Sequence, residues 1–452
     1  SHYSGLGEEE SINRQFSAVL NAILILGSIA AVFLVVFAGP LMGLIVKGFD
    51  DPVLMLSIRL ARIVFPVVLC IGLTNLFTSL LNSLHIYNMT GIVRVVTNFT
   101  GIVFILLFHR MWGVYSLAWG YLAGWFFSVL IQIPVLRSKG IHYRPFFKEQ
   151  IPIIRLVISL VAPLFLGILA SQVNAFVQLR LASGLEAGKV SAMNYSAALF
   201  GTLIVVATQP FFLVLLPKIS RAAKEDDKGD TQRRLKEYSA IFAFIFIPLV
   251  FFLYAKARVI IGIIFGRGDF DIRAITITSD AFKAYAVGLF FWAQSLLLMQ
   301  FFLAGKRTKL IGIVDLVTIS IHIGLNFLLT HYFDLYGLVM AMSIAHGLRY
   351  IAYTFLLRIK SGYETGKTVS QQLLCVAASL PGAVLLYFTH DQIFAWTGRI
   401  IGWTVLGEAS DLIVSAIVFF ALYFLMTKIL HISGPGLALR EFGKTSIMKR
   451  FT

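Results

Sequence analysis

Long apolar segments separated by short polar links run along nearly the whole chain. A window of about 19 residues, the length at which a helix crosses a hydrocarbon core of roughly 30 Å, finds twelve such segments. They span approximately residues 16–38, 53–83, 90–108, 113–136, 153–180, 190–216, 238–255, 276–304, 310–331, 336–358, 369–389 and 408–430. The pattern therefore predicts an all-α polytopic membrane protein with about twelve transmembrane helices.

The polar links carry an uneven distribution of Lys and Arg. If the N-terminal segment is cytoplasmic, the links on that side hold roughly 23 of these residues and the links on the other side roughly 9. The outer set comprises Lys47, Arg110, Arg180, Lys189, Lys256, Arg258, Arg267, Arg273 and Arg399. Because cytoplasmic loops of membrane proteins are enriched in Lys and Arg, we expect both ends of this chain to face the cytoplasm.

The composition excludes a soluble globular fold, since 58% of the 452 residues are hydrophobic and only 13% are charged. The net charge of +16 lies mainly in the links, where it sets topology and meets anionic lipid headgroups. Nucleic-acid binding is not expected, because no basic stripe is interleaved with exposed aromatic residues. Cys70 and Cys375 each lie in an apolar run, so neither a disulfide nor a zinc site is predicted.

Two stretches of the chain resemble each other at an offset of about 221 residues, a duplication found in many transporter folds. The paired segments are QFSAVL at 15–20 with EYSAIF at 237–242, GLIVKGFDD from 43 with GIIFGRGDFD from 262, GIVRVVTNF from 91 with GIVDLVTIS from 312, and the helices that end in RSKG and RIKSG. An even number of spans separates the partners, so they share one orientation. The repeat therefore predicts two parallel lobes related by an axis along the membrane normal.

The second lobe has two additional helices, at 153–180 and 190–216, whose counterparts in the first lobe would precede Ser1. We therefore expect about 70 further residues with two helices upstream, and about fourteen spans in the complete protein. The predicted organisation is a remainder of the N-terminal lobe at 1–140, a six-helix C-terminal lobe at 141–362, and two terminal helices with a basic tail at 363–452.

Ionisable side chains inside the predicted spans are candidates for substrate binding, because each costs at least ~2.5–3.5 kcal/mol to insert. Arg59 and Arg62 lie three residues apart on one helix face. Two guanidiniums directed into one cavity would bind a pyrophosphate through bidentate hydrogen bonds. Arg94 and Asn98 share a face of the next span in the same way. The alternative is that the arginines snorkel to the membrane surface and that Asn98 bridges helices.

Three further polar residues are cavity candidates. Lys283 lies about two turns into its span, although a local pair with Asp280 would be a sufficient explanation. Gln172 and Asn174 belong to a polar row, completed by Gln178, on the span 153–180. That row would either line a wet cavity or hold helices together.

The chain contains no GxxxxGK[ST], HExxH or GxSxG motif. No catalytic residue, cofactor or resident metal is therefore assigned, and an enzyme is not predicted. Transport would draw its energy from an ion gradient or from the membrane potential. His322 and Asn326 lie four residues apart, as two ligands on one helix face would, and together with Gln178 they are the candidates for an ion site.

Several segments carry a resemblance that covers nearly the whole chain. They are RIVFP at 62–66, LLNSL at 80–84, LASGLEAGKVSAMNYSAALF at 181–200, LLPKIS at 215–220, FGRGDFD at 265–271, AYAVGL at 284–289 and FFLAGKRTK at 301–309. Together they resemble the MurJ/MviN family of lipid II flippases, within the superfamily of multidrug, oligosaccharide-lipid and polysaccharide exporters.

The resemblance implies a fourteen-helix fold with a central cationic cavity between two lobes that open alternately, and a lipid-tail groove formed by the last two helices. The implied substrate is lipid II, an undecaprenyl-pyrophosphate carrying a disaccharide-pentapeptide, which is moved to the outer leaflet of the bacterial inner membrane for peptidoglycan synthesis. Membrane lipids and cell-wall synthases are the implied partners. Two alternatives stay open, namely an exporter of another lipid-linked oligosaccharide, such as an O-antigen unit, and a non-transporting membrane scaffold.

The chain departs from the family pattern at two places. After MNYS it has Ala197 and Ala198, where the family usually has an acidic and a basic residue. The positions that correspond to a cation site in some members are Gln178, His322 and Asn326. A coupling cation there would be Na⁺ or H⁺, and a set without carboxylates fits Na⁺ poorly because hard cations favour charged oxygen ligands.

Overall fold

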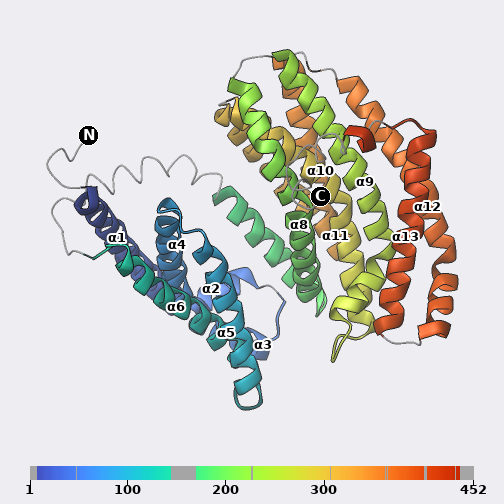
Figure 1. Cartoon of the computed structure of the whole chain (residues 1–452). Helices are drawn as coiled ribbons and strands as arrows, with labels where there is room; N and C mark the ends of the chain where they lie inside the picture. The colour runs from blue at the N-terminus through green and yellow to red at the C-terminus, as the bar shows by residue number, and fades with distance from the viewer. Residues whose placement is uncertain are drawn as a thin grey trace. The chain divides into compact units, whose positions relative to one another are not determined.

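The computed structural model is helical in all of its described regular elements (Figure 1). The structure describes residues 8–46, 48–143, 169–224, 228–305, 307–361, 363, 365–401, 405–432 and 434–437. The chain divides into two compact units, unit 1 within Ser1–Ile168 and unit 2 within Leu169–Thr452. The all-α fold class predicted from the hydrophobic pattern is confirmed. The predicted three-part division at residues 140 and 362 stays a prediction.

Unit 1 contains six labelled helices, which are α1 (Glu8–Val36), α2 (Ala38–Ile45), α3 (Asp51–Val64), α4 (Val67–Ser83), α5 (Asn88–Trp112) and α6 (Tyr115–Ser138). The predicted span 53–83 is divided into α3 and α4 at Pro66, whose ring removes a backbone donor and clashes with the preceding turn. The break leaves Arg62 in the last turn of α3, where the partial negative charge of the helix C-terminus favours a cation.

Unit 2 begins with a helix over residues 169–183. It continues with α8 (Lys189–Lys224), α9 (Lys228–Phe265), α10 (Ile272–Ala304), α11 (Thr308–Ser361), α12 (Thr365–Ile401) and α13 (Val405–Ile429). The long element α11 is two helices joined at Asp334, which has non-helical angles of φ 55° and ψ −138°. The core of unit 2 contains many fully buried aromatic side chains, among them Tyr238, Phe242, Phe282 and Phe302.

Ten helices among the described residues are long and apolar enough to cross a membrane. One of them, Thr308–Ile359, contains both predicted spans 310–331 and 336–358. The predicted span 153–180 lies outside the described residues up to position 168. Each of the other predicted spans corresponds to one of the remaining candidates, so the predicted spans and the observed helices agree.

The repeat recurs in packing and in backbone geometry. In unit 1, α1 packs on α4 and α4 on α6, just as α9 packs on α10 and α10 on α11 in unit 2. Gly48 and Gly268 both have positive φ, at 90° and 62°. Gly113 turns the chain between α5 and α6 with φ 52° and ψ −130°, close to the angles of Asp334. Glycine adopts this conformation freely, whereas an aspartate there stores about 1–3 kcal/mol of strain.

A row of small residues on α6 allows α5 to approach closely. Ser116, Gly120, Gly124 and Ser128 recur every four residues and are buried. The Ser128 hydroxyl donates to the Gly124 carbonyl at 2.8 Å, and its Oγ lies 2.7 Å from Oγ1 of Thr97 on α5. Small residues at this spacing are typical of closely packed membrane helices.

Replacing Gly124 with alanine should lower the free energy of unfolding by about 1–3 kcal/mol, the usual cost of overpacking. The added Cβ would lie 2.6 Å from the Thr97 carbonyl oxygen, so the two backbones would have to separate. Denaturant titration of the purified protein in detergent measures the change. Gly91→Ala on α5 is the control, because its Cβ meets no atom within 4 Å, and equal stability of the two variants would contradict the close approach.

Candidate functional site

The predicted arginine pair lies on an exposed face of α3. Arg59 and Arg62 are both exposed in unit 1, and no ion pair or hydrogen bond engages either guanidinium among the described residues. Arg59 is eight residues and Arg62 eleven residues beyond the start of the helix at Asp51, roughly 12 and 16 Å along its axis at 1.5 Å per residue. A snorkelling side chain would have to cover that depth from the nearer membrane surface, so snorkelling explains Arg62 less well than Arg59.

The second predicted pair, Arg94 and Asn98, is exposed one turn apart on α5. Within the described part of unit 1, Arg94 also has no acidic partner. Both α3 and α5 pack against α6, so one helix holds the two arginine-bearing helices. Unit 1 therefore presents the unneutralised guanidiniums of Arg59, Arg62 and Arg94 and the Asn98 amide on helices that are long and apolar enough to cross a bilayer.

Unit 2 brings the ion-site candidates together in an amide–histidine cluster that joins the helix 169–183 to α11. Nδ2 of Asn174 lies 3.3 Å from Nδ1 of His322, and Nε2 of Gln178 lies 3.2 Å from Nε2 of the same ring. The Asn326 amide donates to Oδ1 of Asn174 at 2.9 Å. His322 and Asn326 are buried, so their predicted common face is directed into this cluster.

Hydrogen-bond chemistry limits what the amide–histidine cluster can bind. Oδ1 of Asn174 already accepts from Asn326, so the Asn174 amide is a donor to His322. A neutral imidazole has one donor and one acceptor nitrogen, and Gln178 must therefore present its oxygen to the other nitrogen. The buried Oδ1 of Asn326 has no partner within the described residues. The cluster thus offers neutral oxygens and an imidazole but no carboxylate, which does not fit a Na⁺ site.

A second polar group on α11 lies near this cluster. Nη2 of Arg349 pairs with Oδ1 of Asp315 at 3.3 Å, and the hydroxyl of Tyr353 donates to the same oxygen at 3.3 Å. Arg349 also interacts electrostatically with His322. Among the residues that the structure describes, no group of three or more His, Cys, Asp or Glu side chains could hold a metal ion.

Two predicted cavity residues lie apart from these groups. Gln172 is exposed on the helix 169–183 and makes no contact with the amide–histidine cluster. Lys283 on α10 pairs with Asp280 at 2.9 Å, three residues earlier on the same helix. The local pair that the sequence suggested is therefore present.

A buried ion pair between α9 and α13 was not predicted from the sequence. Nζ of Lys256 lies 3.1 Å from Oδ2 of Asp411, and the two side chains are 1% and 0% exposed. Assigning Lys256 to an outer polar link was wrong, because α9 continues to Phe265 and turns this side chain into the core. Asp411, a carboxylate inside the predicted span 408–430, was the sequence signal for a buried cation opposite it.

A known protein family matches most of the chain. The sequence model of the family described as "Lipid II flippase MurJ" matches residues 1–405. The chain belongs to the MurJ family. The MurJ family consists of transporters, so the expectation that the chain is not an enzyme is confirmed, and the segments from 62 to 309 that resembled this family were correctly interpreted.

Curated relatives and solved structures agree with the MurJ family. The "Probable lipid II flippase MurJ" of Bdellovibrio bacteriovorus is 24% identical over 418 residues, which cover 91% of this chain and 79% of the relative. The protein of the same description from Thermotoga maritima is 24% identical over 384 residues, covering 85% and 76%. A structure titled "Lipid II flippase MurJ, inward closed conformation" matches with a TM-score of 0.77 at 20% identity, covering 95% of this chain and 86% of that one.

A multidrug transporter also has a similar fold. The inward-facing structure of a MATE family multidrug transporter of the MOP superfamily matches with a TM-score of 0.65 at 17% identity, covering 76% of this chain and 80% of that chain. At these identities the two structural matches establish the fold alone.

Proposed function

We propose that this chain is a flippase that moves lipid II from the cytoplasmic to the outer leaflet of a bacterial inner membrane. The observation that carries the proposal is the match of residues 1–405 to the lipid II flippase family. The cargo combines a diphosphate, sugars and a long apolar tail. The protein therefore has to supply cationic and polar groups within the bilayer.

The exposed arginines of unit 1 support this proposal chemically. A guanidinium inside a membrane span is costly unless it meets a partner, and Arg59, Arg62 and Arg94 have none among the described residues. A diphosphate would neutralise them through charge-assisted, bidentate hydrogen bonds. Asn98, one turn from Arg94, would donate to and accept from sugar hydroxyls.

The proposed topology places both ends of the chain in the cytoplasm. Removing the buried Lys256 from the outer links leaves roughly 8 outer cations against roughly 23 cytoplasmic ones, so the charge bias becomes stronger. Cysteine labelling with a membrane-impermeant reagent at a cytoplasmic and an outer link tests this orientation in intact cells.

Coupling in this chain would not use Na⁺ at the amide–histidine cluster, since the cluster contains no carboxylate. We therefore expect that exchanging NaCl for choline chloride leaves the Tm of the purified protein unchanged. Asn326→Asp should introduce a Na⁺-dependent rise in Tm, because it places a charge on the buried Oδ1 that has no partner among the described residues. A Na⁺-dependent Tm in the unmodified protein would contradict this expectation.

Depletion of the full-length protein in its host tests the proposed function. Wall synthesis should stop while lipid II accumulates in the cytoplasmic leaflet, as measured by its resistance to a lipid II hydrolase added outside. Normal wall synthesis with loss of another surface polysaccharide would instead indicate an exporter of another lipid-linked oligosaccharide. Normal levels of every lipid-linked intermediate would indicate a membrane scaffold.

A further inference from the structure

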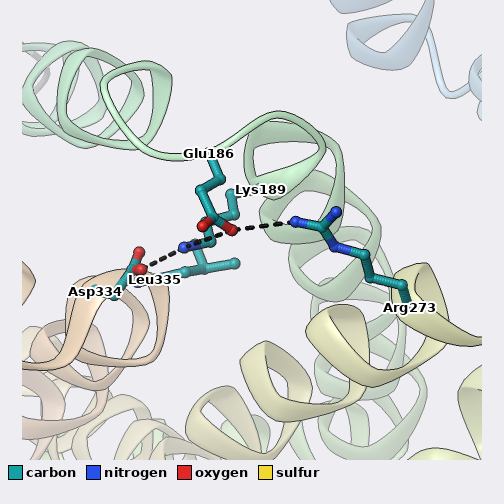
Figure 2. Close-up of polar contacts among 5 residues, drawn as sticks. All are labelled: Glu186, Lys189, Arg273, Asp334 and Leu335. Carbon is teal, nitrogen blue, oxygen red and sulfur yellow. Dashed lines mark hydrogen bonds and ion pairs between the residues drawn. The ribbon is translucent and has the colours of Figure 1, made fainter.

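Four charged residues from three interhelical links meet at one end of unit 2 (Figure 2). Glu186 precedes α8, Lys189 begins it, Arg273 lies in the first turn of α10, and Asp334 is the break in α11. Lys189 pairs with Asp334 and lies 3.6 Å from Glu186, which in turn accepts from Arg273 at 3.2 Å. We call these four residues the ionic clamp. The charge bias predicts that this end faces outward.

Asp334 occupies a backbone position that suits glycine. The equivalent turn of the first repeat has Gly113 at nearly the same φ and ψ. An aspartate is strained there, and residues held in such conformations are concentrated at functional sites. Its side chain makes two specific contacts, because Oδ1 accepts from the Leu335 N–H at 2.6 Å and Oδ2 pairs with Lys189. Asp334 is thus less suited to this backbone conformation than glycine, but its side chain makes a contact to α8 that glycine could not make.

The ionic clamp joins helices that otherwise touch little. Within unit 2, α8 packs mainly against α10 and has few contacts with α11. Lys189 is 11% exposed and lies between two carboxylates, whereas Asp334 is 50% exposed and open to water. The described contact between α8 and α11 at this end is therefore largely the ion pair between Lys189 and Asp334. Asp334, Glu186 and Arg273 are 50–68% exposed, so water can solvate these three groups when the contacts separate.

We propose that the ionic clamp holds the start of α8 against the break in α11 in the conformation described here, and that it opens when this end of unit 2 rearranges during transport. The proposal rests on the proposed flippase function for its second part only. The closing contact itself is a property of unit 2, and its loss can be measured on purified protein without substrate.

Distances between spin labels at Ser191→Cys on α8 and Ile344→Cys on α11 test the ionic clamp, in a Cys70→Ala background. We expect one narrow distance distribution in the otherwise unmodified protein. Asp334→Asn keeps an acceptor for the Leu335 N–H but removes the ion pair, and it should add a second, longer population. Lys189→Gln should do the same, which gives an independent variant should either one fail to fold. Asp269→Asn is the control, since it changes the charge equally at an exposed position outside the clamp.

The outcomes separate the two proposals. A distribution unchanged by both Asp334→Asn and Lys189→Gln would overturn the ionic clamp. If the distances respond and the flipping rate of lipid II in vesicles changes at least about two-fold, both parts of the clamp proposal hold. If the distances respond while the rate stays unchanged, the clamp is a static fastening and its opening during transport is refuted. If the unmodified protein moves no lipid II, the proposed function fails while the closing contact stands.

Discussion

Replacing Asp411 with alanine should lower the free energy of unfolding by about 3–5 kcal/mol, because it removes a buried counter-charge of the Lys256 ammonium. Both side chains are almost fully excluded from solvent, and Asp411 also accepts from the Ser415 hydroxyl at 3.4 Å. The pair fastens α13 to α9. Denaturant titration in detergent, followed by tryptophan fluorescence, measures the loss.

Removing both charges provides the decisive comparison. A buried ion pair contributes little relative to well-packed apolar residues of the same volume, so Lys256→Met with Asp411→Leu should recover most of the lost stability. A double variant as unstable as Asp411→Ala would show that the loss comes from packing and not from the removed counter-charge. Ser410→Ala is a matched control, since its hydroxyl bonds only within its own helix, to the Gly407 carbonyl.

Replacing Arg62 with glutamine should reduce lipid II flipping by about 10- to 100-fold, the effect of losing a charge-assisted hydrogen bond of about 1.5–3 kcal/mol. The side chain is exposed in the last turn of α3 and has no partner within the described residues, so its loss should leave folding intact. The fraction of lipid II that becomes accessible to an external hydrolase in proteoliposomes measures the rate.

Two further substitutions test whether the effect is specific to the Arg62 guanidinium. The flipping rate of Arg62→Lys should lie between those of the unmodified protein and Arg62→Gln, because lysine keeps the charge but loses the bidentate geometry that a diphosphate uses. Arg110→Gln, at an exposed position in the last turn of α5, should flip at the normal rate. Full activity of the Arg62→Gln protein would remove this residue from the proposed binding surface.

Local chemistry made part of this molecule predictable. The apolar segments corresponded to the candidate membrane helices. A chain in hydrocarbon must pair its backbone groups within one helix, so each span is a continuous apolar segment that can be recognised from composition. The pairing of Gly48 with Gly268 followed the sequence repeat, whereas the break of the predicted span 53–83 at Pro66 was not predicted. Lys283 and Asp280 met as their spacing predicted.

The polar partners across helices could not be predicted in the same way. Periodicity placed His322 and Asn326 on one face of a helix, but it did not say that Asn174, 148 residues before His322, would lie opposite. Lys256 and Asp411 are 155 residues apart, and Lys256 resembled an ordinary link residue. Helical spacing predicts which side chains share a face, but it does not predict which helix packs against that face.

The membrane class, the spans, the repeat and the family could all be predicted from the sequence, because they depend on the length and order of apolar segments and on short motifs along one chain. Only the tertiary structure decided that His322 lies in an amide cluster without carboxylates, that Lys256 is buried against Asp411, and that Asp334 is held by Lys189. The physical reason is that a charge or an amide in a membrane protein takes its role from the group opposite it. That group is chosen by the packing of distant helices.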